Sequence, residues 1–323
     1  MRVAVIGAGA MGGLAALLLD KAGVEVVVYE LREERVAGIR GSGIRVRGAV
    51  SGEAFPEVGL AGEAVAPYDM MVLAMGAGGT GDALRPLSPF VHRDTVYLSL
   101  QDGNAVTGLA GLVGEERAFA AVAWVSAVED PGGEVEVEDF RSLVLGAFLP
   151  GREAVMEPIV EALEAVFPGK ARVTADLRGE TWKRLEAAAA VSGLCAVVGA
   201  APQEAQAMEG LDRLCGEAAG ECRRAAACNG RDPSEPGSPW EDALWRRVKP
   251  PMLADIEAGR MTEIDHLSGS IVEHARAANI PVPVHSAILT LVKEIESGRH
   301  RPGEAALKEL KRRIAEEKGM SLV

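Results

Sequence analysis

The segment Gly7-Ala8-Gly9-Ala10-Met11-Gly12-Gly13 constrains the fold of this 323-residue chain more than any other. It follows an apolar run at 3–6 and precedes an apolar helical pattern at 14–21. A strand, a Gly-x-Gly-x-x-Gly turn and a helix in this order predict a dinucleotide-binding site. In such a turn Gly7 permits a tight bend, Gly9 lets the backbone approach a pyrophosphate, and Gly12 lets helix and strand pack closely. Because a helix N-terminus supplies backbone N–H donors to phosphates, Ala10 and Met11 are expected to bind the cofactor as well.

An acidic residue, Glu30, follows the next expected strand at 24–29. A carboxylate at this position can accept hydrogen bonds from the diol of an adenosine ribose, and it would repel a 2′-phosphate. We therefore expect NAD as the cofactor, with NADP less favoured. Arg32 and Arg35 lie nearby and offer positive charge that would partly reverse this preference.

Strands and helices alternate through the first half of the chain, which predicts a parallel Rossmann sheet. Three further segments, 119–128, 134–138 and 143–145, resemble strands without clear crossovers and are expected to extend the sheet antiparallel. The first domain is expected to cover residues 1–174. Its other expected elements are strands at 44–48, 69–75, 95–100 and 171–173, and helices at 33–40, 82–87 and 153–166.

Two strand ends add candidate binding residues. The strand at 69–75 ends at Met75 and Gly76, and glycines follow at 78 and 79. In a doubly wound sheet this end faces the cofactor, so Met75 and Gly76 are expected to contact it; a flexible loop is the alternative. Asp102 follows the strand at 95–100, where it would bind cofactor, a substrate amine or a substrate hydroxyl, or only cap the next helix.

From residue 175 onwards the chain is almost entirely helical, so the fold class is α/β, with a Rossmann dinucleotide-binding domain followed by an all-α domain at 175–323. The cleft between two such domains is the expected substrate site. Ala-rich helices pack within a domain or between subunits, which leaves a homodimer possible. Helices are expected at 180–198, 203–229, 240–248, 252–258, 263–278, 286–297 and 303–317, with a polar loop at 230–239.

Composition excludes several classes of partner. The net charge of −13 argues against nucleic acid, because phosphates would repel such a surface. Asp20 and Lys21 interrupt the only early apolar segment, so neither a membrane span nor a signal peptide is expected. The four cysteines have no C-x-x-C spacing and are expected to be reduced, as in a cytoplasmic protein.

Several motifs together resemble the ketopantoate reductase (2-dehydropantoate 2-reductase) family nearly from end to end. They are the glycine turn at 7–12, Ser99-Leu100-Gln101-Asp102-Gly103, Trp182, Met252-Leu253-Ala254-Asp255-Ile256, Gly259-Arg260-Met261-Thr262-Glu263-Ile264-Asp265 and Ala278-Asn279-Ile280-Pro281-Val282-Pro283. The resemblance implies an NAD(P)-dependent reductase with a small anionic substrate.

The positions that this family uses for catalysis have changed. Two residues after the tryptophan, Arg184 stands where the family has a proton-donating lysine. Of the other positions, only Glu263 keeps the family residue. The family's two substrate-binding asparagines correspond to Ala188 and Ser192, the asparagine of its Gln-Asn-Gly turn to Asp102, its serine before Met-Leu to Pro251, and a lysine after the fourth strand to Gly76.

The chemistry of these residues suggests new roles. A guanidinium stays protonated at any accessible pH, so Arg184 is a poor general acid, but it can clamp a carboxylate or stabilise an oxyanion. Glu263 and His266 lie three apart on one expected helix, and His266 titrates in the range useful for a replacement acid; a surface or half-buried histidine is the alternative. Ser192 remains a candidate for substrate binding.

No metal site is expected, because Glu263 and His266 have no second Glu-x-x-His partner. His92, His285 and His300 are expected in turn or surface contexts. The favoured function is hydride transfer between NAD(P) and a small 2-oxo or 2-hydroxy acid that need not be ketopantoate. The alternative is a dinucleotide-binding sensor or partner subunit without reductase activity.

Overall fold

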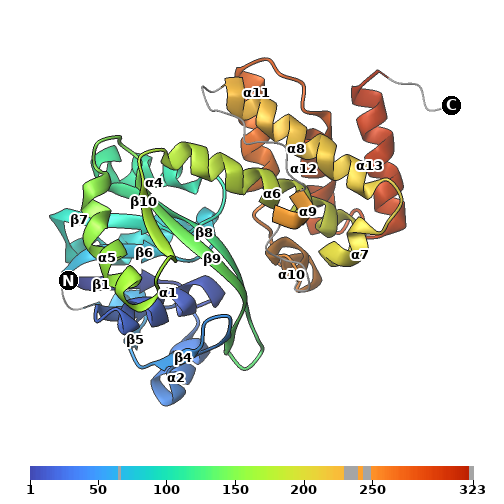
Figure 1. Ribbon diagram of the computed structural model, residues 1–323. Coiled ribbons are helices and arrows are strands. Elements are labelled where there is room, and N and C mark those ends of the chain that lie inside the picture. The colour runs from blue at the N-terminus through green and yellow to red at the C-terminus, as the bar shows by residue number, and fades with distance from the viewer. Residues whose placement is uncertain (65–66, 229–238, 243–248, 320–323) are drawn as a thin grey trace. The chain divides into compact units, whose positions relative to one another are not determined.

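The structure, a computed structural model, describes residues 1–64, 67–228, 239–242 and 249–319. Two compact units comprise Met1–Leu177 and Arg178–Val323 (Figure 1). The first contains a β-sheet with helices, and the described part of the second is helical. The α/β fold class with a helical C-terminal part is thereby confirmed. Most of the loop expected at 230–239 and of the helix expected at 240–248 lies outside the described residues.

A mixed sheet in the order β4-β3-β9-β8-β7-β6-β1-β2-β5 organises the first unit. Its run β5-β2-β1-β6-β7-β8 is parallel throughout, which is the strand order of a Rossmann fold. The chain leaves β1 towards one edge and returns at β6, so the topological switch point lies between these two strands. The parallel strands are β1 (Arg2–Ile6), β2 (Glu25–Tyr29), β5 (Glu57–Gly59), β6 (Tyr68–Leu73), β7 (Val91–Ser99) and β8 (Ala118–Glu129).

Beyond β7 the sheet differs from the expectation. β8 joins β7 in parallel, because helix α4 (Ala105–Val113) provides a crossover that the sequence did not reveal. The helix is only nine residues long and contains Gly108 and Gly111, which lower its helix propensity and weaken its signal in the sequence. The two short strands expected at 134–138 and 143–145 are one strand, β9 (Val135–Ala147), antiparallel to β8.

Three smaller strands join the sheet through strand β9, two by pairing with it directly and one by pairing with its neighbour. Its first residues pair in parallel with β3 (Ile44–Gly48), which forms an antiparallel hairpin with β4 (Gly52–Ala54). Its last residues pair in parallel with β10 (Ala171–Thr174).

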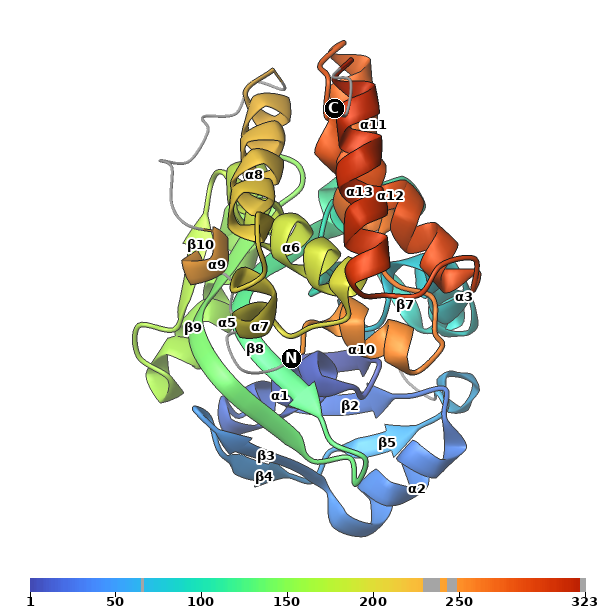
Figure 2. The same ribbon diagram turned by 90° about the vertical axis from the view of Figure 1, so that its right-hand side faces the viewer.

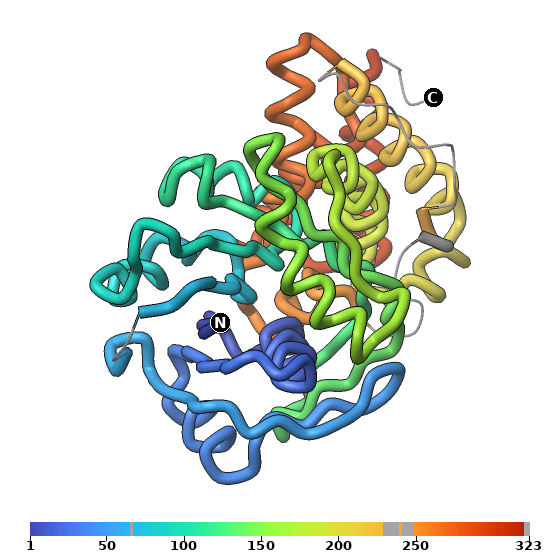
Figure 3. The backbone as a smooth tube through the Cα atoms, turned by 60° about the vertical axis from the view of Figure 1, so that its left-hand side comes forward, coloured from blue at the N-terminus to red at the C-terminus, as the bar shows by residue number. Residues whose placement is uncertain are grey.

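Helix α1 (Ala10–Lys21) is enclosed by this sheet. It contacts β2, β3, β4, β8 and β9, and Figure 2 shows these strands around it. A Cβ added at Gly13 would lie 2.9 Å from Val135 Cγ2, so only glycine permits this approach of α1 to β9. Helix α5 (Glu157–Val166) packs beside α1 (Figure 3). The remaining helical segments of this unit are α2 (Glu33–Ser42), α3 (Thr80–Leu84) and the 3₁₀ turns Ala61–Glu63, Ala77–Gly79, Arg85–Phe90, Glu115–Arg117 and Glu153–Met156.

The second unit packs its helices around the Ala-rich α6 (Leu177–Val198), whose residues from Ala187 to Val198 are buried. Gly193 lets α12 approach α6, because a Cβ there would lie 2.8 Å from Ile288 Cγ2. The helix expected at 263–278 is instead a π-helical turn followed by a shorter α-helix. The described elements after α6 are α7 (Pro202–Gln206), α8 (Leu211–Cys228), α9 (Pro239–Asp242), α10 (Pro251–Glu257), the π-turn η6 (Asp265–Gly269), α11 (Ser270–Ala277), α12 (Pro283–Glu296) and α13 (Glu304–Glu317).

Candidate cofactor and substrate site

The glycine turn lies at the carboxyl end of β1, where the order of the strands reverses. Gly7 has a φ of +96° and donates its N–H to the carbonyl of Tyr29 at 2.7 Å, so the turn is fastened to β2. A Cβ added at Gly12 would lie 1.8 Å from the Gly7 carbonyl oxygen, which only glycine allows. Gly9 is the N-cap of α1 and provides no side-chain cap, so the first turn of the helix can offer its N–H groups to a phosphate. This backbone suits the pyrophosphate of a dinucleotide.

The end of β6 lies directly against this turn. A Cβ added at Gly7 would lie 3.0 Å from Met75 Cβ, and the Ala74 N–H donates to the Ile6 carbonyl at 2.9 Å. Met75, expected from the sequence to contact the cofactor, therefore neighbours the glycine turn, and Gly76, for which the same was expected, follows it directly. A 3₁₀ turn begins at Ala77, so part of the segment expected as a possible flexible loop is helical.

Gln101 holds this edge of the sheet together, a role that its sequence motif did not suggest. Its side-chain amide donates to the Met75 carbonyl and to Thr80 Oγ1, both at 2.9 Å. Ser99 Oγ in turn lies 3.1 Å from the Gln101 amide oxygen. The neighbouring Asp102 is half-buried in the turn before α4, and the N-cap position of that helix belongs to Asn104.

Glu30 is buried at the end of β2, with 8% of its surface exposed. Its carboxylate accepts hydrogen bonds from the N–H groups of Ala8 at 3.0 Å and Leu31 at 2.8 Å, and from the backbone and guanidinium of Arg32. Burial alone would raise the pKa of Glu30, but these hydrogen bonds outweigh it and lower the pKa below its usual value. Glu30 is therefore ionised, and it ties the glycine turn to β2.

Two arginines and a second carboxylate extend this cluster. Arg35 lies 3.0 Å from Glu129 Oε1 and also donates to the Ala8 carbonyl, while Arg32 lies 3.6 Å from Glu129 Oε2. The carboxylate of Glu129 approaches the glycine turn, since a Cβ at Gly9 would lie 3.7 Å from its Oε2. No sequence motif singled out Glu129, which lies at the end of β8, far away in the chain.

The candidate substrate residues belong to the second unit. Arg184 and Ser192 lie on α6 at 5% and 1% exposure, and their spacing of eight residues places them on one face of the helix. Glu263 lies two residues before the π-turn and His266 lies within it; both are half-buried, and the His266 N–H donates to the Glu263 carbonyl at 3.0 Å. Residues three apart share a face on an α-helix, but a π-turn is wider than an α-turn, so this relation does not apply unchanged to Glu263 and His266.

The expectation for His285 is wrong. This histidine is fully buried in α12, and burial lowers its pKa to about 4. Its imidazole lies 2.9 Å from the Ala218 carbonyl and 3.2 Å from Ser268 Oγ. The prolines and valines just before His285 resemble a turn in the sequence. In the structure α12 already begins at Pro283, and His285 belongs to the buried face of this helix.

Among the described residues, no group of three or more His, Cys, Asp or Glu side chains is placed to hold a metal ion. Cys195, Cys215 and Cys222 are buried free thiols, and Cys228 is exposed. No helix in the described ranges is both long enough and apolar enough to cross a membrane.

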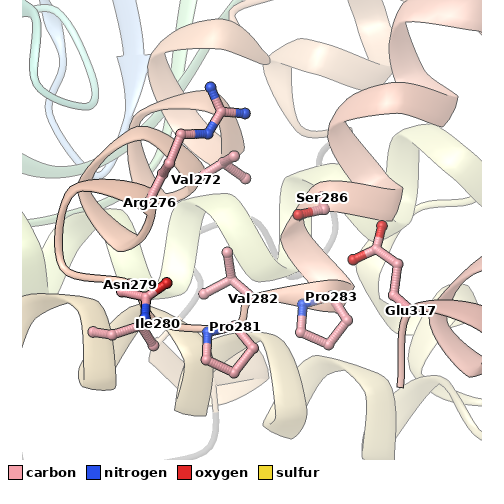
Figure 4. A pocket seen from close by; sticks show the side chains of 9 residues that line it. All are labelled: Val272, Arg276, Asn279, Ile280, Pro281, Val282, Pro283, Ser286 and Glu317. Carbon is pink, nitrogen blue, oxygen red and sulfur yellow. The ribbon is translucent and has the colours of Figure 1, made fainter. Parts of the chain in front are cut away.

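A separate pocket of about 380 Å³ lies in the second unit, at the start of α12. Figure 4 shows Arg276 and Glu317 on opposite sides of it, above a floor that includes Ile280 and Pro281. None of the expected site residues lines this pocket.

Family models match the chain over most of its length. Residues 3–150 match the model "Ketopantoate reductase PanE/ApbA", and residues 176–296 match its C-terminal companion, "Ketopantoate reductase PanE/ApbA C terminal". The chain belongs to the ketopantoate reductase family. It is thus a ketopantoate reductase-like oxidoreductase with an NAD(P)-binding fold, and the expectation of an NAD(P)-dependent enzyme is confirmed.

Related proteins agree with this membership. The chain is 26% identical to the 2-dehydropantoate 2-reductase of Pyrococcus horikoshii, covering 92% of this chain and 98% of the relative. A D-mandelate dehydrogenase solved with NADH and anilino(oxo)acetate superposes with a TM-score of 0.84 at 22% identity, covering 92% and 99% of the two chains. A 2-dehydropantoate 2-reductase from Geobacter metallireducens superposes with a TM-score of 0.82 at 25% identity, covering 91% and 99%. The matched 2-dehydropantoate 2-reductases give no support to the alternative of a sensor without reductase activity.

Proposed function

We propose that this oxidoreductase transfers a hydride between NAD(H) and a small 2-oxo or 2-hydroxy acid, which need not be ketopantoate. The observation that carries the proposal is the glycine turn at the switch point, held by the Ala8–Glu30 hydrogen bond and left without a side-chain cap on α1. The named relatives include 2-dehydropantoate reductases and a mandelate dehydrogenase. Both kinds of substrate are small acids with oxygen on the carbon next to the carboxylate.

The cofactor preference follows from the charges beside the glycine turn. Glu30 and Glu129 together neutralise Arg32 and Arg35. A 2′-phosphate would have to compete with two carboxylates for these guanidinium groups, whereas a ribose diol carries no charge. We therefore propose that NADH binds more tightly than NADPH. Calorimetric titration of the protein with each dinucleotide tests this, and tighter binding of NADPH would refute it.

A bound nicotinamide supplies the hydride, and the chain must supply the charge and the proton for the substrate. Arg184 is proposed to fix the substrate's carboxylate through a bidentate contact. Ser192 and Asp102 are proposed to contact substrate, and Asp102 also the cofactor. Glu263 is proposed to orient the substrate or the nicotinamide ribose, and His266 to protonate the oxygen that develops negative charge as the hydride arrives.

Steady-state kinetics on single variants tests these roles. Ketopantoate and phenylglyoxylate are suitable first substrates, with NADH consumption as the readout. Arg184→Ala is expected to raise KM steeply, Glu263→Ala to lower kcat, and His266→Gln to lower kcat while removing one limb of the pH profile. Unchanged turnover in Arg184→Ala and Glu263→Ala would refute the assignment.

A homodimer is a further proposal. The family includes a ketopantoate reductase from Staphylococcus aureus described as dimeric, to which this chain is 15% identical with a TM-score of 0.75. Light scattering coupled to size-exclusion chromatography distinguishes a dimer from a monomer of 33.8 kDa.

A further inference from the structure

One face of α12 contacts segment 262–269, which includes Glu263, from near the N-terminal end of the helix to its C-terminal end. At the C-terminal end of the helix, Glu296 Oε1 accepts hydrogen bonds from the backbone N–H and the hydroxyl of Thr262, both at 2.7 Å. Further back, Lys293 forms an ion pair with Asp265. At the N-terminal end, His285 contacts Ser268. Segment 262–269 therefore runs antiparallel to α12.

The spacing of these contacts identifies a single stripe on the helix. Residues 285, 289, 293 and 296 follow one another at intervals of four, four and three, which places them on one face. Leu289 fills the gap between the polar contacts, since a Cβ added at Gly269 would lie 3.6 Å from its Cδ1. We use the name α12 ladder for five contacts. They are the two hydrogen bonds from Thr262 to Glu296, the Lys293–Asp265 ion pair, the His285–Ser268 contact and the packing of Leu289 near Gly269.

The segment held by the ladder is a π-turn. The Gly269 N–H donates to the Ile264 carbonyl at 3.0 Å, which is the i to i+5 bond of a π-helix. Such turns are rare because an ordinary α-helix makes better use of the backbone, so tertiary contacts must favour the wider turn. Thr262 fixes its beginning further, because its hydroxyl accepts the N–H of Ile264 at 3.2 Å.

His285 is itself rigidly oriented. The Ala218 carbonyl can only accept a hydrogen bond, so the imidazole Nε2 carries the proton, and Nδ1 accepts the hydroxyl of Ser268. The backbone N–H groups of Val284 and His285 donate to the buried carboxylate of Glu221 at 2.9 and 3.0 Å. The ladder thus rests on a helix whose N-terminus is fixed to α8.

We propose that Thr262, Ser268, His285 and Glu296 are positioning residues, and that the α12 ladder sets the direction of the Glu263 and His266 side chains by holding the π-turn open. The inference rests on the proposed function, in which these two side chains act on substrate or cofactor. If the ladder breaks, the turn relaxes towards an α-helix and the two side chains rotate about the helix axis. A displacement of about 1 Å at reacting groups costs on the order of 10- to 100-fold in rate.

Isosteric substitutions at Thr262 provide the test. Thr262→Val removes both hydroxyl hydrogen bonds at nearly constant volume, and Thr262→Ser keeps them. With NADH and phenylglyoxylate or ketopantoate, we expect Thr262→Val and Ser268→Ala to lower kcat on the order of tenfold while the Kd for NADH stays unchanged. Thr262→Ser should retain kcat within about twofold. Thr290→Val is the matched control, because its hydroxyl bonds only to the Ser286 carbonyl on the exposed side of α12.

Two further measurements separate positioning from stability. In a background that carries both Glu263→Gln and His266→Gln, Thr262→Val should lower kcat no further, since both side chains that it misplaces have already lost their function. Proton NMR of the His266 ring should show changed chemical shifts in Thr262→Val and Ser268→Ala, and unchanged ones in Thr290→Val. The NMR measurement needs no substrate, so failure of the proposed function leaves it intact. Equal losses of kcat in Thr262→Val and Thr262→Ser, or unaltered chemical shifts of the His266 ring, would overturn the inference.

Discussion

The imidazole of His285 lies 3.2 Å from the hydroxyl of Ser268, with both groups sealed from solvent in the core of the helical unit. This contact joins α12 to the π-turn, which contains His266 and directly follows the segment of Glu263, so a buried histidine about 20 residues further along the chain contacts a candidate catalytic segment. The carboxylate of Glu221 holds the same histidine from the other side through its backbone N–H. Glu221 and His285 are two buried titratable groups in contact with each other, and burial shifts their pKa values in opposite directions. Their contributions to the free energy of unfolding therefore change with pH in opposite senses.

The first prediction concerns the pH dependence of stability. Burial raises the pKa of Glu221 to about 7, so its contribution to folding is present below the ordinary carboxyl pKa and lost as the pH rises through 7. Burial lowers the pKa of His285 to about 4, so its contribution is present above its ordinary pKa of 6.5 and lost as the pH falls through 4. Each effect amounts to about 3 kcal/mol. Between roughly pH 4.5 and 6.5 the two pH dependences have opposite signs, so the free energy of unfolding changes little with pH on their account.

Single substitutions should expose each effect. In Glu221→Gln, His285 is the one of the two titratable groups that remains. The free energy of unfolding of this variant should therefore fall more steeply than that of the wild type as the pH is lowered from 6.5 to 4. His285→Asn leaves Glu221, so stability should fall as the pH is raised from 4.5 to 7. Urea unfolding at a series of pH values measures both slopes. Two variants with profiles parallel to the wild type would contradict the prediction.

The second prediction concerns the glycine turn. Gly12→Ala places a Cβ 1.8 Å from the Gly7 carbonyl oxygen, so the turn or the start of α1 must move. We expect loss of measurable NADH binding together with a lower free energy of unfolding. Gly38→Ala is the control, because a Cβ in this exposed part of α2 meets no atom within 4 Å. It should leave NADH affinity unchanged and add roughly 0.5–1 kcal/mol of stability. Normal NADH binding by Gly12→Ala would show that the turn is not the phosphate site.

Local signals in the sequence predicted the strand, the glycine turn and the helix at the start of the chain, because these elements follow one another directly. The same pattern placed Met75 and Glu30 at the ends of neighbouring strands, and the structure shows both beside the turn. Gln101 was missed as a contact of Met75, and Glu129 as a neighbour of Gly9, because strand pairing brings these residues together from distant segments. Helix α4 was missed because it is short and contains Gly108 and Gly111, which lower helix propensity. The π-turn depends on packing between helices, which no local pattern encodes. His285 was assigned to a turn because the expected helix began at 286, whereas α12 begins at Pro283.

The third prediction concerns the choice between NADH and NADPH. Glu129→Gln removes one negative charge from the cluster with Arg32 and Arg35 but keeps the size of the side chain. The freed guanidinium groups should attract a 2′-phosphate, so the ratio of the Kd for NADPH to that for NADH should fall about fivefold, or about 1 kcal/mol. Glu136→Gln is the control, since this carboxylate pairs with Arg47 on the exposed sheet. An equal change in both variants would mean that overall charge, and not this cluster, sets the preference.

The fourth prediction returns to the position where the family has its proton-donating lysine. Arg184→Lys restores that residue type on α6, at a site only 5% exposed, where burial would favour the neutral amine and so its release of a proton. If Arg184 acts as a carboxylate clamp, Arg184→Lys should raise KM for phenylglyoxylate, because an ammonium lacks the bidentate fork. If proton transfer limits the reaction, kcat should rise in the same variant, and its pH profile should gain a new descending limb.

Arg184→Gln separates the two effects, since it keeps a hydrogen-bond donor but has neither charge nor a transferable proton. It should raise KM as Arg184→Lys does, by on the order of tenfold or more, without the gain in kcat. Kinetics across the pH range, with the Kd for NADH measured in parallel, checks both variants. A KM that is unchanged in Arg184→Gln would exclude a contact between Arg184 and the substrate's carboxylate, because removing a charged partner from a bound anion cannot leave its affinity intact.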